Sequence, residues 1–512
     1  MHRVRPRVTM ARMMRLRSRR ALDRASCLAL LLAAAPSVAP STALAEVSLD
    51  TPFQDHAVLQ REREIRVTGR AEPNEALVLT FGAARVPGQA GADGRFALAL
   101  APMPASLEAR DLVVEGKSGQ ASAKDILVGE VWFCSGQSNM EWTVDGANEA
   151  DRAKSMAAKM PIRSYKAPHV TANKPAAKVD GAWRLASPET VGGFTAVGWW
   201  FGVDLARAFD LEVPIGLVDI SWGGTRIEPW IPLDAMAKSD FKPVADALAA
   251  RIAKFEADPA ADGKAPGTEP HEPAAIYNAM MAPWIAYPVR GAIWYQGESN
   301  SGEPDKYRKL LPLLIRSWRE KSGNADMAWG VVQLAAFQPF LEGEPAQGAW
   351  ALLREAQFRG AREAGNAGMI SAIDLGDAGD IHPRRKREVG ERLASWARST
   401  VYGEASVAWQ GPELAKAQRG AGATVRLSLA FAKGLRATGA EPGGFALCGA
   451  DRKFVWAKAT IDGESIVLEA PGVAEPVEAA YAWQNNPERA NIVNAAGLPM
   501  VPFRAKVAQA AR

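Results

Sequence analysis

A serine stands at the end of an apolar run that stops abruptly in small and polar residues. The run 128–134 is rich in branched and aromatic residues, and Ser135-Gly136-Gln137-Ser138-Asn139 follows it. Such side chains fill a pleated surface, whereas Gly136 can adopt backbone angles closed to residues with a Cβ. The pattern predicts a buried strand that presents the Ser138 hydroxyl at its carboxyl end, as a nucleophile requires. The alternative is a helix whose N-cap is Ser138 or Asn139, with no chemical role.

A serine nucleophile needs a general base, and the chain holds five histidines: His2, His56, His169, His271 and His382. Four of them lie in regions where we expect no catalysis, namely a leader segment, an N-terminal β-region and two surface insertions. His382 follows a predicted strand and precedes a predicted helix that starts near Pro383. The positive end of a helix dipole favours the neutral imidazole that a base must be. We therefore expect His382 to be the base; otherwise Asp380 caps the helix and His382 is a surface residue.

Two carboxylates compete to orient the histidine. Asp380 stands two positions before His382, although a separation of three, which falls here on Gly379, is usual for this class of serine enzyme. Glu298 lies in the run Trp294-Tyr295-Gln296-Gly297-Glu298-Ser299-Asn300, at the end of another predicted strand. Asp374 and Asp377 are weaker candidates, so the choice between Asp380 and Glu298 stays open at this point.

Acyl transfer also needs hydrogen-bond donors for the developing oxyanion. The run 221–226, Ser-Trp-Gly-Gly-Thr-Arg, follows a predicted strand, and Gly224 could bring a backbone N–H close to a ligand. Gln296 and Asn300 offer side-chain amides. Most tryptophans near these motifs are expected in the core, but Trp222 or Trp230 could stack on a sugar face. No cluster of His and Cys at metal-ligand spacing and no phosphate-binding Gly-rich motif is present in the sequence, so no metal or other cofactor is expected.

These residues need a scaffold, and the stretch 127–402 has an α/β pattern. Apolar strands are predicted at 215–220, 291–295, 329–334 and 368–373, and helices at 196–209, 279–286, 307–321 and 352–363. Buried parallel strands with helical crossovers imply a three-layer α/β/α sandwich whose chemistry gathers at the carboxyl ends of the strands. Two stretches rich in Ala, Lys, Pro and Asp, near 145–190 and 232–275, are predicted to be surface insertions or lids.

The flanking regions show short alternating strands. Residues 46–126 and 403–512 are each predicted to form a β-sandwich-like domain. Residues 1–45 combine an arginine-rich start, a short apolar run and Ala43-Leu44-Ala45, which predicts a secretory signal cleaved near Ala45 and an exported, periplasmic or secreted, protein.

The composition of the whole chain excludes several other classes of protein. It is 48% hydrophobic and 23% charged, as in a soluble globular protein, and no segment is apolar enough to span a membrane. The net charge of +4 comes from the leader, so nothing favours nucleic acid as a partner. Cys134 and Cys448 fall in different predicted domains and are expected to be free thiols.

Four ordered blocks resemble the motifs of the sialate O-acetylesterase family, which belongs to the SGNH or GDSL-like hydrolases. They are Gly129–Met140, Ser221–Trp230, Trp294–Asn300 and the run Asp380-Ile381-His382-Pro383, and both ends of the mature chain are also similar to the family. The resemblance implies that Ser138 is the nucleophile and His382 the base. It also implies an oxyanion hole drawn from the Ser138 N–H, Gly224, Gln296 and Asn300, and a substrate contact at Arg226 within the second block.

One departure from the superfamily pattern keeps the choice of carboxylate open. Gln137 stands where the wider superfamily has Asp, and similar acetyl-xylan esterases are thought to use the glutamate that corresponds to Glu298. The implied function is an exported serine esterase that removes O-acetyl groups from sialic acid or another carbohydrate. The alternatives are an acetyl-xylan or hemicellulose acetylesterase, and an inactive carbohydrate-binding protein.

Overall fold

The computed structural model describes residues 46–259 and 264–509 and has a parallel sheet at its centre. The strands of this sheet run in the order β10 (Ala182–Leu185), β9 (Ile162–Lys166), β11 (Ile215–Ser221), β8 (Gly119–Gly136), β12 (Gly291–Tyr295), β13 (Ala328–Gln333) and β14 (Ala367–Ser371). All neighbours are parallel except β10, which pairs antiparallel with β9 at one edge. Every residue of β11, β12 and β13 is buried, which explains their continuous apolar sequences.

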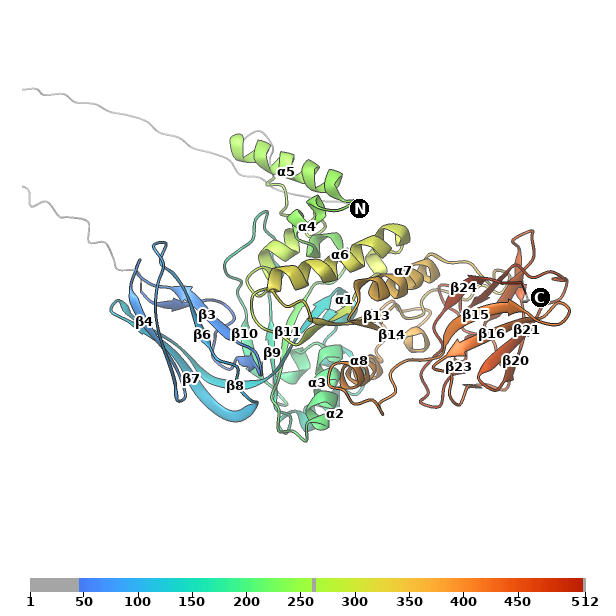
Figure 1. Ribbon diagram of the computed structural model, residues 1–512, viewed down its shortest axis with the longest axis horizontal. Coiled ribbons are helices and arrows are strands. Elements are labelled where there is room, and N and C mark those ends of the chain that lie inside the picture. The colour runs from blue at the N-terminus through green and yellow to red at the C-terminus, as the bar shows by residue number, and fades with distance from the viewer. Residues whose placement is uncertain (1–45, 260–263, 510–512) are drawn as a thin grey trace, which may run out of the picture. The chain divides into compact units, whose positions relative to one another are not determined.

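Helices cover both faces of this sheet. Helices α3 (Ala196–Ala208) and α8 (Lys386–Thr400) pack together on one face, and α6 (Pro304–Ser322) and α7 (Ala349–Ala364) pack together on the other (Figure 1). Helix α6 shows why these residues form a helix: Pro304 suits its first turn, leucines, Ile315 and Trp318 lie on the buried face, and Gly323 ends it in the left-handed conformation with φ 66°. The predicted three-layer α/β/α core is confirmed.

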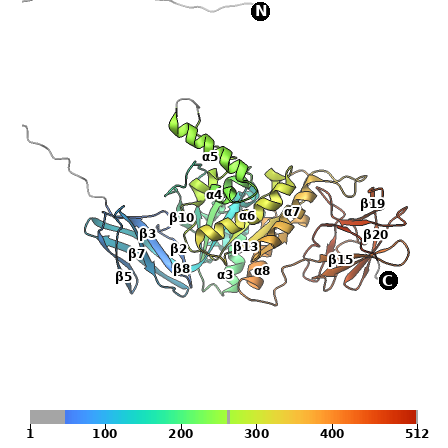
Figure 2. The ribbon, with the colours of Figure 1, turned by 45° about the horizontal axis from the view of Figure 1, so that its top comes forward.

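Strand β8 is longer than the sequence pattern predicted. Its first part pairs with β7 (Ser106–Gly116) in the N-terminal region (Figure 2). Its last part lies between β11 and β12 in the central sheet. The boundary expected near residue 126 therefore falls inside one continuous strand of 18 residues. The strand that ends at the predicted nucleophile is thus shared by two sheets.

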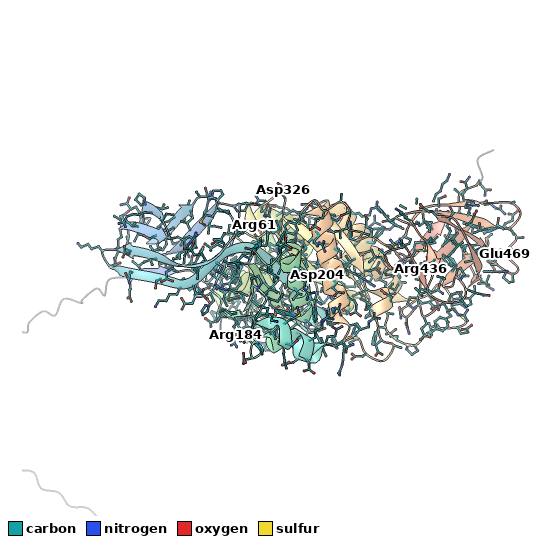
Figure 3. The ribbon with its side chains drawn as sticks, turned by 90° about the horizontal axis from the view of Figure 1, so that it is seen from below. Arg61, Arg184, Asp204, Asp326, Arg436 and Glu469 are labelled. Atoms are coloured by element: carbon teal, nitrogen blue, oxygen red, sulfur yellow. The ribbon has the colours of Figure 1, made fainter. Side chains whose placement is uncertain are left out.

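The remaining strands form flanking β-regions. The N-terminal strands are β1 (Ser48–Leu49), β2 (Val58–Gln60), β3 (Ile65–Arg70), β4 (Ala76–Phe81), β5 (Ala84–Gln89) and β6 (Arg95–Leu100). The C-terminal strands are β15 (Glu413–Arg419), β16 (Val425–Ala430), β17 (Arg436–Ala437), β18 (Phe445–Cys448), β19 (Phe454–Trp456), β20 (Lys458–Asp462), β21 (Ser465–Glu469), β22 (Glu478–Tyr481), β23 (Ile492–Val493) and β24 (Phe503–Lys506). Arg436 and Glu469, labelled in Figure 3, mark β17 and β21, and this region has its own hydrophobic core.

The structure corrects the expectation that residues 145–190 are only a surface insertion. This stretch contains α2 (Ala150–Ala157) and contributes β9 and β10 to the central sheet. Strand β9 is mostly buried although its sequence contains several polar residues. Their polar groups have partners: Arg163 pairs with Asp125 at 2.8 Å, and the Tyr165 hydroxyl donates to the Asp180 carbonyl at 2.8 Å. A prediction based on hydrophobicity misses this strand, because its polar side chains are buried with hydrogen-bond partners.

The remaining expectations have different outcomes. The stretch 232–275 forms α4 (Leu233–Ala237) and α5 (Lys242–Ala257), and the helix predicted at 279–286 is a short π-helix at Tyr277–Met281. Cys134 and Cys448 are free and buried, as expected. The predicted signal segment 1–45 lies outside the described residues. Among the helices of the described chain, none has the length and apolarity needed to traverse a bilayer.

Candidate active site

The end of β8 carries Ser138 into the site through a turn that only glycine fits. Gly136 has φ +135°, and a Cβ at this position would lie 2.2 Å from the Tyr295 carbonyl oxygen of the neighbouring strand. The Gln137 N–H then donates to that same oxygen at 3.0 Å, and Ser138 begins the four-residue helix α1 (Ser138–Glu141). The chain therefore leaves the sheet with Ser138 half-buried at its carboxyl edge.

His382 lies beside this serine. Its Nε2 is 2.8 Å from the Ser138 Oγ, and its ring stacks on Trp142 with centroids 4.9 Å apart. Helix α8 begins only at Lys386 and not near Pro383 as predicted, so His382 lies in a loop and not directly at the helix N-terminus. Burial and the nearby Lys386 cation lower the pKa of His382, which favours the neutral imidazole without a helix dipole.

The two competing carboxylates have different surroundings. Asp380 Oδ1 lies 3.8 Å from His382 Nδ1 and accepts a hydrogen bond of 2.8 Å from the His382 backbone N–H. Glu298 instead accepts a hydrogen bond of 2.5 Å from the Asn139 side-chain amide, and burial raises its pKa. Of the two, Asp380 is the carboxylate in contact with the histidine.

The weaker candidates have other partners. Asp374 forms a bidentate pair with Arg392, with both distances 2.7 Å. Asp377 accepts from the Gly379 N–H at 2.8 Å. Both carboxylates thus serve the local structure of the loop.

Hydrogen bonds interlock the motif loops around Ser138. Gln137 Oε1 accepts from the Gly297 and Ser299 N–H groups at 3.4 and 3.3 Å. The Ser299 hydroxyl donates to the Gly224 carbonyl at 2.9 Å. Gln137 therefore ties the serine turn to the loop 296–300, and that loop in turn fixes the peptide units at Gly224.

The predicted oxyanion donors differ in whether their N–H groups already donate hydrogen bonds within the protein. The Gln296 amide already donates to the Thr225 carbonyl at 3.2 Å and to Asn300 Oδ1 at 2.8 Å. The Asn300 amide donates to Glu228 at 3.1 Å. Among the hydrogen bonds of the described chain, no acceptor takes the Ser138 or Gly224 N–H. These two backbone groups are the available donors, and Gln296 and Asn300 hold the loops.

A second aromatic contact lies at the same edge of the sheet. Trp222 stacks on His169 with centroids 4.5 Å apart, and His169 Nε2 lies 2.9 Å from Glu141 Oε1. Burial alone would raise the pKa of Glu141, but hydrogen bonds from His169 and from the Gly223 N–H, the latter at 2.6 Å, lower it. His169, which the sequence placed in an insertion, is thus brought to the site.

The other predicted substrate contacts are enclosed or paired. Trp230 is fully buried, its indole N–H donates to the Thr225 hydroxyl at 3.2 Å, and it packs edge-to-face on Trp294. This burial argues against the predicted stacking of Trp230 on a sugar. Arg226 is half-buried and pairs with Glu228 and Glu303.

Sequence reasoning missed several residues that contact the site. Asn139, Trp142 and Lys386 all lie within four positions of Ser138 or His382, and this proximity in sequence was the available signal. Glu141 was detectable in the same way. His169 carried no such signal, because its approach depends on how β9 joins the sheet.

Comparisons with known proteins identify the family of this chain. Residues 128–399 match the family described as carbohydrate esterase, sialic acid-specific acetylesterase. The sialate O-acetylesterase of Pongo abelii is 31% identical over 71% of this chain and 71% of its own length, and that of Rattus norvegicus is 29% identical over 75% and 78%. The crystal structure of a carbohydrate acetylesterase from Xanthomonas citri is 34% identical, covers 90% of this chain and 99% of its own, and superimposes with a TM-score of 0.79. The chain therefore belongs to the sialic acid-specific acetylesterase family of carbohydrate esterases and is a carboxylic ester hydrolase.

Proposed function

We propose that the protein is an exported serine esterase that removes O-acetyl groups from carbohydrates, with Ser138 as nucleophile and His382 as general base. The distance of 2.8 Å between Ser138 Oγ and His382 Nε2 is the observation that carries this proposal. Nucleophile and base within hydrogen-bond reach, at the carboxyl edge of a parallel sheet, are what acyl transfer needs.

The reaction proceeds in two steps. Ser138 Oγ attacks the acetyl carbonyl carbon while His382 Nε2 takes the hydroxyl proton, and the Ser138 and Gly224 N–H groups receive the oxyanion. The intermediate collapses when His382 returns the proton to the sugar oxygen, which leaves as the free hydroxyl. Water then attacks the acetyl-serine with His382 again as base, and acetate departs with Ser138 restored.

Asp380 is the acid partner in this proposal. Its Oδ1 lies 3.8 Å from His382 Nδ1, which is too long for a hydrogen bond. Catalytic hydrogen bonds often tighten once substrate is bound, and an imidazolium would draw the carboxylate closer. We expect Asp380→Asn to lower kcat by about a hundredfold or more.

The family match supports sialic acid esters as substrates. The Xanthomonas citri relative is described more broadly as a carbohydrate acetylesterase, which keeps acetylated xylan or another hemicellulose as the second candidate. Comparison of kcat/KM on O-acetylated sialic acid and on acetylated xylan separates the two. Trp222→Ala should raise KM on the preferred sugar more than on p-nitrophenyl acetate, because only the sugar offers a face for stacking.

The central test is hydrolysis of p-nitrophenyl acetate by Ser138→Ala. We expect kcat to fall by about a thousandfold or more, whereas Ser155→Ala, on the outside of α2, should retain wild-type activity. Full activity of Ser138→Ala would overturn the mechanism. A folded wild-type protein with no activity on any acetyl ester would favour the alternative of an inactive carbohydrate-binding protein.

Export rests on the leader segment alone. Expression of the full chain in a bacterial host followed by mass spectrometry of the mature protein should give an N-terminus at Glu46, after Ala45. An intact leader on cytoplasmic protein would contradict this part of the proposal.

A further inference from the structure

A chain of three buried polar side chains lies directly behind the catalytic pair. The Lys386 ammonium donates to Asn139 Oδ1, and Asn139 Nδ2 donates to Glu298 Oε1 at 2.5 Å. Lys386 and Asn139 are each 1% exposed and Glu298 is 9% exposed. One amide therefore bridges an ammonium and a carboxylate that have almost no access to water.

The bridging amide also connects the two segments that carry the reacting groups. Asn139 follows Ser138 on α1, and its Nδ2 donates a second hydrogen bond of 3.0 Å to the carbonyl of Ile381, the residue before His382. Each hydrogen of the amide thus has an acceptor, one on Glu298 and one on the histidine loop. A shift of Asn139 would move Ser138 and His382 relative to each other.

This arrangement costs stability. Burial lowers the pKa of Lys386 to about 7 and raises the pKa of Glu298. Glu298 Oε2 is buried and has no hydrogen-bond partner among the described residues. Apolar side chains of similar volume commonly stabilise such a site better than a buried ion pair. Incompletely satisfied titratable groups of this kind concentrate at functional sites.

Lys386 also acts on the histidine through its charge. Its ammonium lies 6.0 Å from the Trp142 ring centroid and 5.4 Å from that of Tyr295, and Trp142 is the ring that stacks on His382. A cation so close to an imidazole disfavours a second positive charge on it. The positive charge of Lys386 therefore contributes to the lowered pKa of His382.

Other nearby groups also affect the protonation of His382. Asp380 on the same loop favours protonation of the ring, and burial opposes it. Glu298 faces Lys386 across Asn139 and offsets part of its charge. Glu141 on α1 is occupied by His169. Among the described residues whose charges act on the His382 ring, Lys386 is the buried cation.

We infer that Lys386, Asn139 and Glu298 form a positioning chain that holds His382 against Ser138 and keeps its imidazole unprotonated. The inference rests on the proposed function, since it assigns the three residues to the serine esterase reaction. It makes Glu298 a positioning residue and not the acid partner of the histidine.

The test is the pH profile of Lys386→Met with p-nitrophenyl acetate, from about pH 4 to about pH 9. We expect the acid limb of kcat/KM to move to higher pH, because the opposing cation is gone. We expect kcat to fall about tenfold with KM changed less than about twofold, because geometry is lost and binding is not. The matched control is Arg384→Met, which removes an exposed cation two positions from His382 and should leave the acid limb in place.

A second pair of variants tests the bridge. Asn139→Leu removes all three hydrogen bonds of the amide, to Lys386, Glu298 and the Ile381 carbonyl, and should lower kcat at least as much as Lys386→Met. Glu298→Gln should cost about tenfold in kcat in the wild-type background and clearly less in the Lys386→Met background, because the two act through one chain.

The outcomes separate the inference from the proposed function. A folded Lys386→Met protein, checked by circular dichroism, with an unmoved acid limb overturns the inference, whether or not kcat falls. If Lys386→Met does not fold, equal kcat losses for Glu298→Gln and Asp380→Asn overturn it, since both would then act as acid partners. Full activity in Ser138→Ala refutes the proposed function itself and is independent of these results.

Discussion

Two buried glutamates near the strands of the central sheet have opposite surroundings. Glu130, within β8, accepts from Arg61 at 2.5 Å, from Arg290 at 2.8 Å and from the Tyr402 hydroxyl at 3.0 Å. Glu298, just after β12, accepts a side-chain hydrogen bond only from Asn139 among the described residues. Burial raises the pKa of both, but in Glu130 the pairs with Arg290 and Arg61 outweigh it and lower the pKa.

The two glutamates differ in how many hydrogen-bond partners their buried carboxylates have. Glu130 joins the strand β8 to Arg61 in the N-terminal region and to Arg290 before β12, with both carboxylate oxygens satisfied. Glu298 keeps one oxygen without a partner at the carboxyl edge, beside the reacting groups. Removal of one partner from a fully paired buried carboxylate is costly, whereas poorly paired buried carboxylates concentrate at functional sites.

The largest expected effect on stability is that of Glu130→Gln. Loss of the carboxylate removes the anion that Arg61 and Arg290 share and leaves Arg290, among the described residues, only its longer pair with the exposed Glu62, which should cost about 3 kcal/mol or more in the free energy of unfolding. Urea denaturation measures this loss. Asp462→Asn, which breaks an exposed pair with Arg426, is the control and should change stability by less than about 1 kcal/mol. Equal losses of stability in Glu130→Gln and Asp462→Asn would show that the buried pairs of Glu130 contribute no more than an exposed pair.

Asp219→Asn should have an intermediate effect of opposite sign. Burial raises the pKa of Asp219 from 3.8 to about 6, so folding favours its protonated form. The resulting penalty is absent below about pH 4 and complete above about pH 6. Asparagine has no such penalty and can still accept from the Ser221 hydroxyl. We expect the variant to be more stable by about 2 kcal/mol at pH 7 and equal to wild type near pH 4. Thermal unfolding at the two pH values measures it, and a variant less stable at pH 7 would contradict the prediction.

The smallest effect on stability is expected for Glu298→Gln. Because folding raises the pKa of Glu298, its charge costs stability at neutral pH, and the amide avoids this cost. The free energy of unfolding of the variant should lie within about 1 kcal/mol of the wild-type value or slightly above it, although we expect its turnover to be lower. A loss of stability as large as that of Glu130→Gln would show that the two glutamates have the same role.

Much of the core fold could be predicted from local patterns. Strands β11, β12 and β13 are continuous apolar runs, and α6 and α7 have a clear apolar face, so their positions follow from side-chain type alone. Strand β9 was missed because Arg163 and Tyr165 are buried through partners far away in sequence. The start of α8 was placed too early because Pro383 resembles a first helical residue, yet the chain is not helical until Lys386.

The sequence by itself determined that Ser138 and His382 follow strand ends of one parallel sheet, and therefore that both belong to the same edge. Local composition is enough for this, since buried strands and their turns are encoded by neighbouring residues. Only the tertiary structure decided that Asp380 and not Glu298 contacts the histidine, that Trp230 is enclosed, and that Asn139 bridges Lys386 and Glu298. These contacts join residues up to 247 positions apart, and their distances depend on how strands and helices pack, which no single stretch of sequence specifies.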